Sequence, residues 1–236
     1  MSQRLLDRRD ELAASLADVR ARIAAAAHAA GRDPAAVTLV AVTKTWPADD
    51  VRLLAELGVA DIGENRDQEA APKHEACRDL PLRWHFVGQL QRNKAASVAS
   101  YADVVHSVDR LELVRALDRH ARSHGRRLTL LVQVALDETA GRAGVEPAEV
   151  PTVADAIAAS GALELGGVMA VAPLGEDPDA AFARLARTAT VLRAAHPTAT
   201  IVSAGMSADL EAAIRHGATH VRIGTALLGP REPSFG

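Results

Sequence analysis

The chain has 236 residues, of which 27 are basic and 30 acidic, and hydrophobic residues make up 48% of it. This composition excludes a wholly disordered chain. The near-balanced charge and the few aromatic residues argue against a protein whose main task is to hold nucleic acid. The single cysteine, Cys77, excludes an internal disulfide and a cysteine-based zinc site. With no signal-peptide pattern and no apolar run of the ~20 residues that span a bilayer, we expect a cytoplasmic protein without membrane contacts.

The first expected element is a long helix over residues 2–30. Gly31 is a typical helix stop, and Pro34 cannot continue the helix. The apolar residues of this segment recur at spacings of three, four and seven and predict one buried stripe: Leu5, Leu12, Leu16, Val19 and Ile23.

Beyond this helix, eight short apolar runs alternate with helical segments. The expected strands cover 38–43, 59–63, 83–87, 103–107, 129–135, 163–170, 200–203 and 220–223. The expected helices cover 47–57, 65–77, 91–100, 110–124, 147–160, 179–195, 208–216 and 225–228. Such alternation implies parallel strands with right-handed crossovers.

Eight strand–helix units predict an α/β fold, a closed (β/α)8 TIM barrel with an extra N-terminal helix. A doubly wound open sheet is the alternative. The strand count and the absence of a Gly-x-Gly-x-x-Gly turn after the first strand disfavour it. No linker-like stretch divides the chain, so we expect residues 1–236 to form a single domain.

Lys44 follows directly after the first expected strand. In barrels of this kind the active site lies at the C-terminal ends of the strands. A lysine in a half-apolar site has a lowered pKa, and its free amine suits Schiff-base chemistry with an aldehyde or ketone. A lysine that simply reaches solvent from a strand end is the alternative.

The segments that follow the seventh and eighth expected strands are rich in small residues. Ser203 to Ser207 precedes a helix that we expect Ser207 to cap, with Asp209 in its first turn, and Gly224 and Thr225 open the last helix. Small residues let a phosphate approach backbone N–H groups, and barrels often bind phosphate at these two strands. The pattern therefore predicts a phosphate site.

Two further strand residues are candidates for the site. Arg222 lies inside the eighth strand, where it forms a structural ion pair or points inward toward a ring nitrogen or a substrate anion. His85 lies between Trp84 and Phe86, which we expect to pack against helices. His85 then faces the lumen, as a site histidine or as a core histidine.

Two other patterns carry little weight. His120 and His124 lie four residues apart, but arginines surround them and the His-Glu-x-x-His pattern is absent, which favours a solvated basic face. Residues 141–144 are too short for a P-loop and predict a loop after the fifth strand.

Taken together, the strand-end segments resemble the motifs of the pyridoxal phosphate homeostasis proteins. The resemblance spans nearly the whole chain, in order: AVTKT (41–45), GEN (63–65), WHFVGQLQRNK (84–94), HSVDR (106–110), GVMA (167–170), SAGMSAD (203–209) and VRIGT (221–225). It implies a barrel like the N-terminal domain of alanine racemase, called fold type III. It also implies pyridoxal 5′-phosphate held as a Schiff base on Lys44.

The same resemblance implies further cofactor contacts. Arg222 faces the pyridine nitrogen and keeps it unprotonated, which weakens the ring as an electron sink. The implied phosphate cradle consists of Ser203, Gly205, Met206, Ser207, Gly224 and Thr225. The implied ring pocket consists of Asn65, His85 and Met169. Many relatives have Tyr, Asn and Lys where this chain has Arg66, Ala135 and Arg142, which affects the pocket rim and cofactor hand-over.

We therefore expect a monomeric pyridoxal phosphate binding protein of intracellular vitamin B6 homeostasis, without catalytic residues, metal or robust turnover. Apoenzymes that require the cofactor are the expected partners. The alternative is a racemase-type enzyme, which needs a second acid/base opposite the lysine, typically a tyrosine from another domain. Tyr101, the single tyrosine, is expected at the end of a helix on the wrong face. A third hypothesis is a Schiff-base aldolase that acts on a sugar phosphate.

Overall fold

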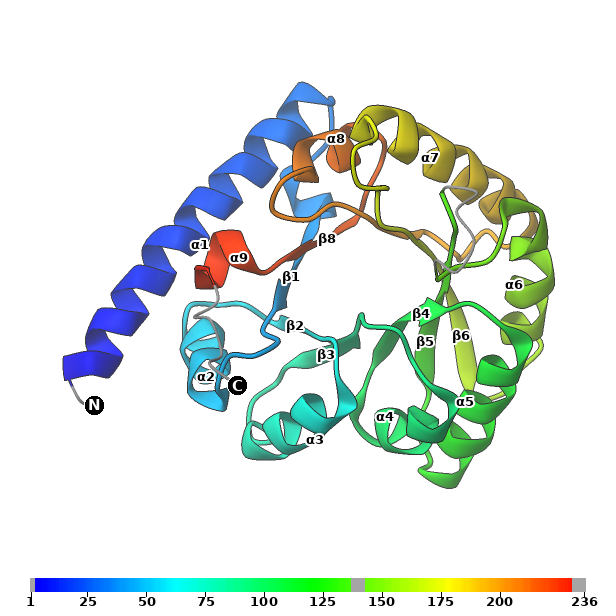
Figure 1. Ribbon diagram of the computed structural model, residues 1–236, viewed down its shortest axis with the longest axis horizontal. Helices are drawn as coiled ribbons and strands as arrows, with labels where there is room; N and C mark the ends of the chain where they lie inside the picture. The colour runs from blue at the N-terminus through cyan, green and yellow to red at the C-terminus, as the bar shows by residue number, and fades with distance from the viewer. Residues whose placement is uncertain (1–2, 137–142, 231–236) are drawn as a thin grey trace.

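Eight parallel strands close into a barrel in chain order, β1 to β8 (Figure 1). The computed structural model describes residues 3–136 and 143–230. The strands are β1 (Thr38–Val42), β2 (Asp61–Glu64), β3 (Arg83–Phe86), β4 (Val104–Val108), β5 (Leu128–Gln133), β6 (Leu163–Met169), β7 (Ile201–Ser203) and β8 (His220–Ile223). The predicted TIM barrel is confirmed, and the open-sheet alternative is wrong.

Helices surround the barrel as an outer layer (Figure 1). They are α1 (Gln3–Ala29), α2 (Ala48–Glu56), α3 (Asp67–Ala76), α4 (Ala95–Tyr101), α5 (Leu111–Ser123), α6 (Val150–Ala158), α7 (Pro178–Ala195), α8 (Leu210–Arg215) and α9 (Thr225–Leu228). Short 3-10 turns precede three elements: η1 (Pro34–Ala36), η2 (Arg92–Lys94) and η3 (Pro147–Glu149). No helix of the described residues is long and apolar enough to cross a membrane.

The barrel closes where β1 pairs with β8. Leu39 lies opposite Val221, and Ala41 lies opposite Ile223. This register brings the C-terminal ends of the first and last strands side by side. It therefore places Lys44, two residues beyond β1, next to the segment that follows β8.

Helix α1 is the predicted extra element, and it packs along α8 and α9. Four of the five predicted stripe residues are buried: Leu12, Leu16, Val19 and Ile23. The helix ends at Ala29, and Gly31 takes a positive φ of 65° that favours glycine. Arg8 fixes the helix to the barrel because its Nη2 donates to Asp50 Oδ2 at 2.8 Å and to the Leu228 carbonyl at 3.0 Å.

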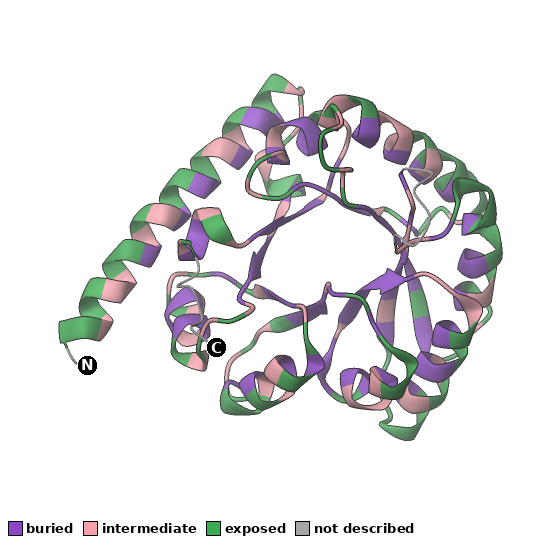
Figure 2. Cartoon of the chain, viewed as in Figure 1, coloured by how far each residue is buried: buried purple, intermediate pink, exposed green. Residues whose placement is uncertain are grey.

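The strands have two buried faces, one toward the helices and one toward the lumen. The strands are buried along almost their whole length, and the helices bury the side that faces them (Figure 2). Trp84 and Phe86 belong to the main core cluster, as their parity predicted. A separate apolar cluster of Val104, Leu131 and Met169 has Ile201 packed against it.

Some predicted boundaries differ from the structure by one to four residues. The largest difference is α4, which begins at Ala95 because residues 92–94 form η2 instead. Ser207 does not cap α8, so that prediction is wrong. The helix begins at Leu210 with Asp209 at the capping position, and the Asp209 carboxylate accepts a hydrogen bond from the Met206 amide at 2.6 Å.

Candidate functional site

Lys44 lies just beyond β1 at a sharp change of backbone direction. Thr43 before it is fully buried, Lys44 is half-buried, and Thr45 after it has a positive φ of 71°. A β-branched residue in this region is strained. The Thr45 amide donates to Glu69 Oε2 at 2.9 Å, which helps to hold the turn. The lysine is therefore presented on a short, fixed turn at the strand end.

Below this turn lies a buried ion pair that the sequence analysis missed. Lys73 Nζ contacts Glu64 Oε1 at 2.5 Å and donates to the Thr43 carbonyl at 2.8 Å. Glu64 Oε1 also accepts from Thr43 Oγ1 at 2.6 Å. Burial raises the pKa of Glu64, and its second oxygen, Oε2, has no partner within the described part of the chain. The pair anchors the residue immediately before Lys44.

Free backbone donors lie in the segments after β7 and β8. The amides of Ser207, Gly224 and Thr225 donate to no other group among residues 3–136 and 143–230. The Met206 amide differs because the Asp209 carboxylate occupies it. Unpaired amides at adjoining loops are the usual donors to an anion such as phosphate.

The two loops are tied to each other. The Gly205 carbonyl accepts from the Arg222 amide at 2.9 Å, and Ser207 Oγ accepts from the Ala226 amide at 3.2 Å. Gly205 has a φ of 90°, and a Cβ there would lie 2.6 Å from the Ala213 Cβ. This close approach requires glycine and fixes the shape of the loop after β7.

Arg222 points into the lumen and is buried, with only 5% of its surface exposed. Its Nη1 donates to Ser203 Oγ at 2.7 Å, and its Nη2 donates to the Ala170 carbonyl at 2.9 Å. No carboxylate of the described residues lies within 4 Å of it, so the ion-pair alternative is not found there. Burial lowers the pKa of Arg222 to about 10. The Asp209 carboxylate acts on Arg222 electrostatically from beyond ion-pair distance. A buried cation without a direct ion-pair partner favours an electron-rich ligand.

The structure shows where the three predicted ring-pocket residues, Asn65, His85 and Met169, lie. Their contacts with a cofactor stay predictions. Asn65 is half-buried directly after β2, and Met169 is buried at the end of β6. His85 faces the lumen, as predicted, but both of its ring nitrogens already contact protein groups, His106 and Asp61. The Ser203 hydroxyl is likewise engaged, between Arg222 and His106.

Tyr101 lies in the outer layer and not in the lumen. It ends α4, and its hydroxyl reaches Asp67 of α3 at 3.5 Å, while its ring lies 5.7 Å from that of His74. Burial raises the pKa of the phenol. Its position agrees with the prediction that it lies on the wrong face for a partner of Lys44.

The three departures from the family pattern lie around the mouth of the barrel or outside the described residues. The Arg66 side chain is exposed and lies 3.7 Å from Glu69 Oε1. The Ala135 amide donates to the Val145 carbonyl at 2.9 Å. Arg142, and half of the predicted loop over 141–144, lie outside the described residues.

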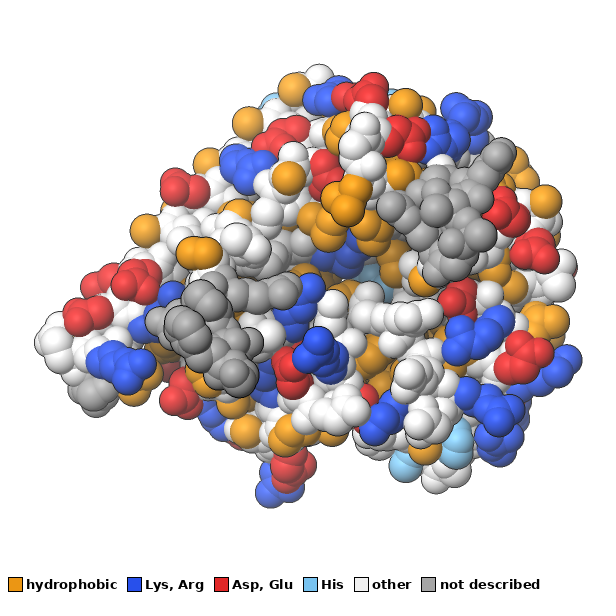
Figure 3. All heavy atoms as spheres, in the orientation of Figure 1, with side chains coloured by type: hydrophobic (Ala, Val, Ile, Leu, Met, Phe, Trp, Pro, Cys, Tyr) orange, Lys and Arg blue, Asp and Glu red, His pale blue; other side chains and the backbone are white. Residues whose placement is uncertain are grey.

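The combined donor set defines what the site can hold. It offers a lysine amine, adjoining unpaired amides and a buried guanidinium at neighbouring strand ends. Figure 3 shows a hollow at the centre of one end of the barrel, with basic side chains within it. These groups fit a ligand with a carbonyl group, a phosphate and an electron-rich ring atom. Among the described residues, no group of three or more His, Cys, Asp or Glu side chains is arranged to hold a metal ion.

Comparison with curated proteins gives consistent relatives. Residues 14–232 match the family model described as alanine racemase, N-terminal domain. A Mycobacterium tuberculosis protein named pyridoxal phosphate homeostasis protein is 46% identical over 247 residues, covering 96% of this chain and 95% of the relative. An Escherichia coli protein of the same name is 37% identical, covering 95% and 99%.

Solved structures agree with these sequences. PipY of Synechococcus elongatus with pyridoxal phosphate bound has a TM-score of 0.79 at 36% identity, covering 92% of this chain and all of that chain. Alanine racemase from Corynebacterium glutamicum has a TM-score of 0.67 at 18% identity, covering 97% of this chain and 62% of the enzyme, and shares the fold. The chain therefore belongs to the alanine racemase N-terminal domain family and, within it, to the pyridoxal phosphate homeostasis proteins.

Proposed function

We propose that this protein binds pyridoxal 5′-phosphate and takes part in intracellular vitamin B6 homeostasis. The observation that carries the proposal is the convergence of the Lys44 turn, the unpaired amides after β7 and β8, and buried Arg222 at neighbouring strand ends. The relatives' names and the pyridoxal-phosphate-bound PipY structure support it.

In this proposal the cofactor is held covalently through Lys44. Nucleophilic attack of Nζ on the cofactor aldehyde, followed by loss of one water, joins the two as an imine. The bound cofactor supplies an aldehyde carbon conjugated to a pyridine ring. The fixed Thr43–Thr45 turn limits the positions of the amine, so less entropy is lost when the bond forms.

We propose the remaining cofactor contacts for residues at the same strand ends. The phosphate lies against the loop that starts at Ser203 and includes Gly205, Met206 and Ser207, and against Gly224 and Thr225. The unpaired amides of Ser207, Gly224 and Thr225 donate to it. Arg222 faces the pyridine nitrogen as a hydrogen-bond donor that keeps this nitrogen unprotonated. The ring pocket is lined by Asn65, His85 and Met169.

We further propose that the protein stores and delivers the cofactor without rapid turnover, although the fold is shared with racemases. Tyr101 cannot face Lys44 from its place between α3 and α4. The chain spans about 62% of the length of the alanine racemase from Corynebacterium glutamicum. We also propose that residues 1–236 act as one domain and as a monomer, with cofactor-requiring apoenzymes as recipients in the cytoplasm.

The absorbance of the purified protein mixed with pyridoxal phosphate tests the binding mode. Wild type should develop an imine band, and borohydride reduction should fix the cofactor to the peptide that contains Lys44, as read by mass spectrometry. Lys44→Ala should lose the band. The matched control Lys94→Ala should keep it, because Lys94 lies in η2 on another strand end. A Lys44→Ala protein that keeps the band overturns the assignment.

Two assays separate the enzymatic alternatives. Incubation of the loaded protein with each L-amino acid, followed by an assay for the D-enantiomer, should show no rapid conversion; rapid conversion would establish a racemase. Borohydride trapping with sugar phosphates in the absence of pyridoxal phosphate should give no adduct on Lys44, whereas an adduct would support the aldolase reading.

A further inference from the structure

A hydrogen-bonded row of five side chains crosses the barrel from Arg222 to Asp61. Arg222 Nη1 lies 2.7 Å from Ser203 Oγ, which lies 2.9 Å from His106 Nδ1. His106 Nε2 lies 2.8 Å from His85 Nδ1, and His85 Nε2 lies 2.9 Å from Asp61 Oδ1. The five residues come from β8, β7, β4, β3 and β2. All except Asp61 are buried.

The two ends of this row fix the direction of every hydrogen bond in it. A guanidinium only donates, so Ser203 Oγ accepts from Arg222 and has its single proton free for His106 Nδ1. His106 then carries its proton on Nε2 and donates to His85 Nδ1. His85 carries its proton on Nε2 and donates to Asp61, which as a carboxylate only accepts.

The reverse direction is unfavourable at both ends. It would turn the lone pair of His85 Nε2 toward the Asp61 carboxylate, so that two acceptors faced each other. It would also leave the Ser203 proton without an acceptor, because Arg222 cannot accept. Burial lowers the pKa of both His85 and His106, which keeps both rings neutral in this arrangement.

We propose that Asp61, His85 and His106 are positioning residues that hold Arg222 through Ser203 by this row of hydrogen bonds. The Asp209 carboxylate acts on Arg222 electrostatically from beyond 4 Å. Asp61 is the carboxylate that the row of hydrogen bonds joins to it. Hydrogen bonds in such a row polarise one another in the same direction. His85 therefore acts on Arg222 through the row in addition to lining the proposed ring pocket.

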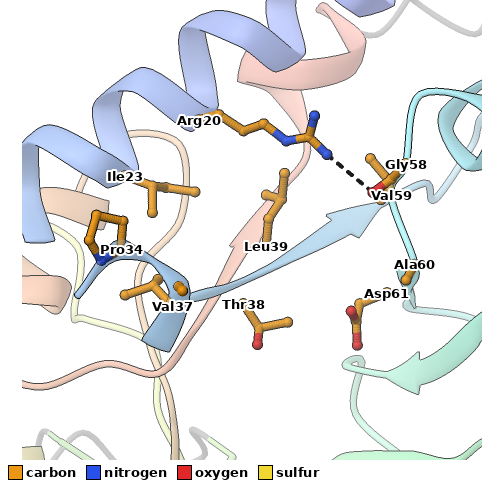
Figure 4. Close-up of a pocket in the computed structure, with 11 residues that line it drawn as sticks. Arg20, Ile23, Pro34, Val37, Thr38, Leu39, Gly58, Val59, Ala60 and Asp61 are labelled. Carbon is orange, nitrogen blue, oxygen red and sulfur yellow. Dashed lines mark hydrogen bonds between the residues drawn. The ribbon is translucent and has the colours of Figure 1, made fainter.

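The far end of the row opens at the other end of the barrel. Asp61 is half-buried at the start of β2 and lines a cavity of about 440 Å³ together with Thr38 and Arg20 (Figure 4). Arg83 and His220 also lie close enough to act on Asp61 electrostatically. The row therefore connects this cavity with Arg222, on the side of the barrel opposite to Lys44.

Side-chain proton exchange at Arg222 tests the proposal in the protein without cofactor. Asp61→Ala should speed exchange of the Arg222 guanidinium protons by about tenfold, the effect of losing one net hydrogen bond. Asp61→Asn keeps an oxygen acceptor and should stay within about twofold of wild type. The matched control Glu164→Ala removes an exposed carboxylate from the start of β6 and should change nothing. ¹⁵N spectra should show His85 and His106 protonated on Nε2.

A second measurement uses the loaded protein and rests on the proposed function. Loss of the negative charge in Asp61→Asn should make the imine release its proton at lower pH than in wild type, with no such shift in Glu164→Ala. Arg222 exchange that is unchanged in Asp61→Ala, or histidines protonated on Nδ1, would overturn the positioning role. Absence of any imine in wild type would instead contradict the proposed function, while the exchange data still decide the role of the row.

Discussion

Glu64 and Lys73 form an ion pair that is almost completely buried, with 1% and 7% of their side chains exposed, directly beneath the strand end that carries Lys44. Lys73 also binds the Thr43 carbonyl. Helix α3 is thereby hydrogen-bonded to the backbone one residue before Lys44, the proposed cofactor lysine. The pair therefore connects the stability of the barrel with the geometry of the site.

Lys73→Met should destabilise the protein by about 3–5 kcal/mol, because it leaves the Glu64 carboxylate buried without its partner. The double variant Glu64→Gln/Lys73→Met should recover part of this loss, since the remaining group is neutral. Urea denaturation measures both. Glu75→Gln removes one member of an exposed pair with Arg78 on the neighbouring turn and should cost under about 1 kcal/mol. A Lys73→Met protein as stable as this control would contradict the prediction.

Thr45→Gly should raise the free energy of unfolding by about 1 kcal/mol, because glycine takes a positive φ without the steric cost that threonine bears. The gain should come with slower imine formation, since the turn that presents Lys44 becomes freer. Denaturation and the rate of the absorbance change measure the two effects. Thr45→Val keeps the branched Cβ and should match wild type in both; a stabilised valine variant would refute the strain explanation.

Gly205→Ala and Gly217→Ala form a matched pair of substitutions. Both residues have φ near 90°, so alanine should cost each about 1–2 kcal/mol. Only at Gly205 does the new Cβ also meet Ala213 and the Leu210 backbone, which should add about 1–3 kcal/mol. Gly205→Ala should also weaken cofactor binding, whereas Gly217→Ala should not. Equal losses of stability would show that the close packing at Gly205 is unimportant.

The alternation of apolar runs and helical segments was sufficient to predict the barrel and the place of every strand. Boundaries were less certain because they depend on local contacts. The prediction that Ser207 caps the helix was wrong because the Asp209 carboxylate accepts a hydrogen bond from the Met206 amide. The Gly-Met-Ser sequence alone does not distinguish this arrangement from a helix capped by Ser207. In the same way, residues 92–94 form the 3-10 turn η2, although their helical pattern predicts that they belong to α4.

The strand ends could be predicted because barrel chemistry lies there, but the polar contacts that support them could not. Asp61, Lys73 and Glu69 carry no motif that separates them from surface charges. Their role depends on which residues the closed barrel brings together across the lumen. One signal was present: His106 interrupts a buried apolar strand on β4, as His85 does on β3. Two such interruptions on adjacent strands predict a contact once the strand order is known.

Acid should destabilise the protein between about pH 6.5 and pH 4 through its lumenal histidines. Burial lowers the pKa of His220 to about 4, and it lowers the pKa of His85 and His106 as well. In the unfolded chain these residues take up protons near pH 6.5, while the folded state does not, so stability is full above that pH and is lost as the pH falls. His220 alone should account for about 3 kcal/mol of this loss.

Denaturation curves at a series of pH values measure this loss. His220→Phe removes one titrating group that faces His85, Asp61 and Arg83, and should reduce the slope of stability against pH by about one proton. His28→Gln, which removes an exposed histidine on α1, is the matched control for the substitution itself. If His220→Phe and wild type lose stability in parallel as the pH falls from 6.5 to 4, His220 is not neutral in the folded protein and the assignment is wrong.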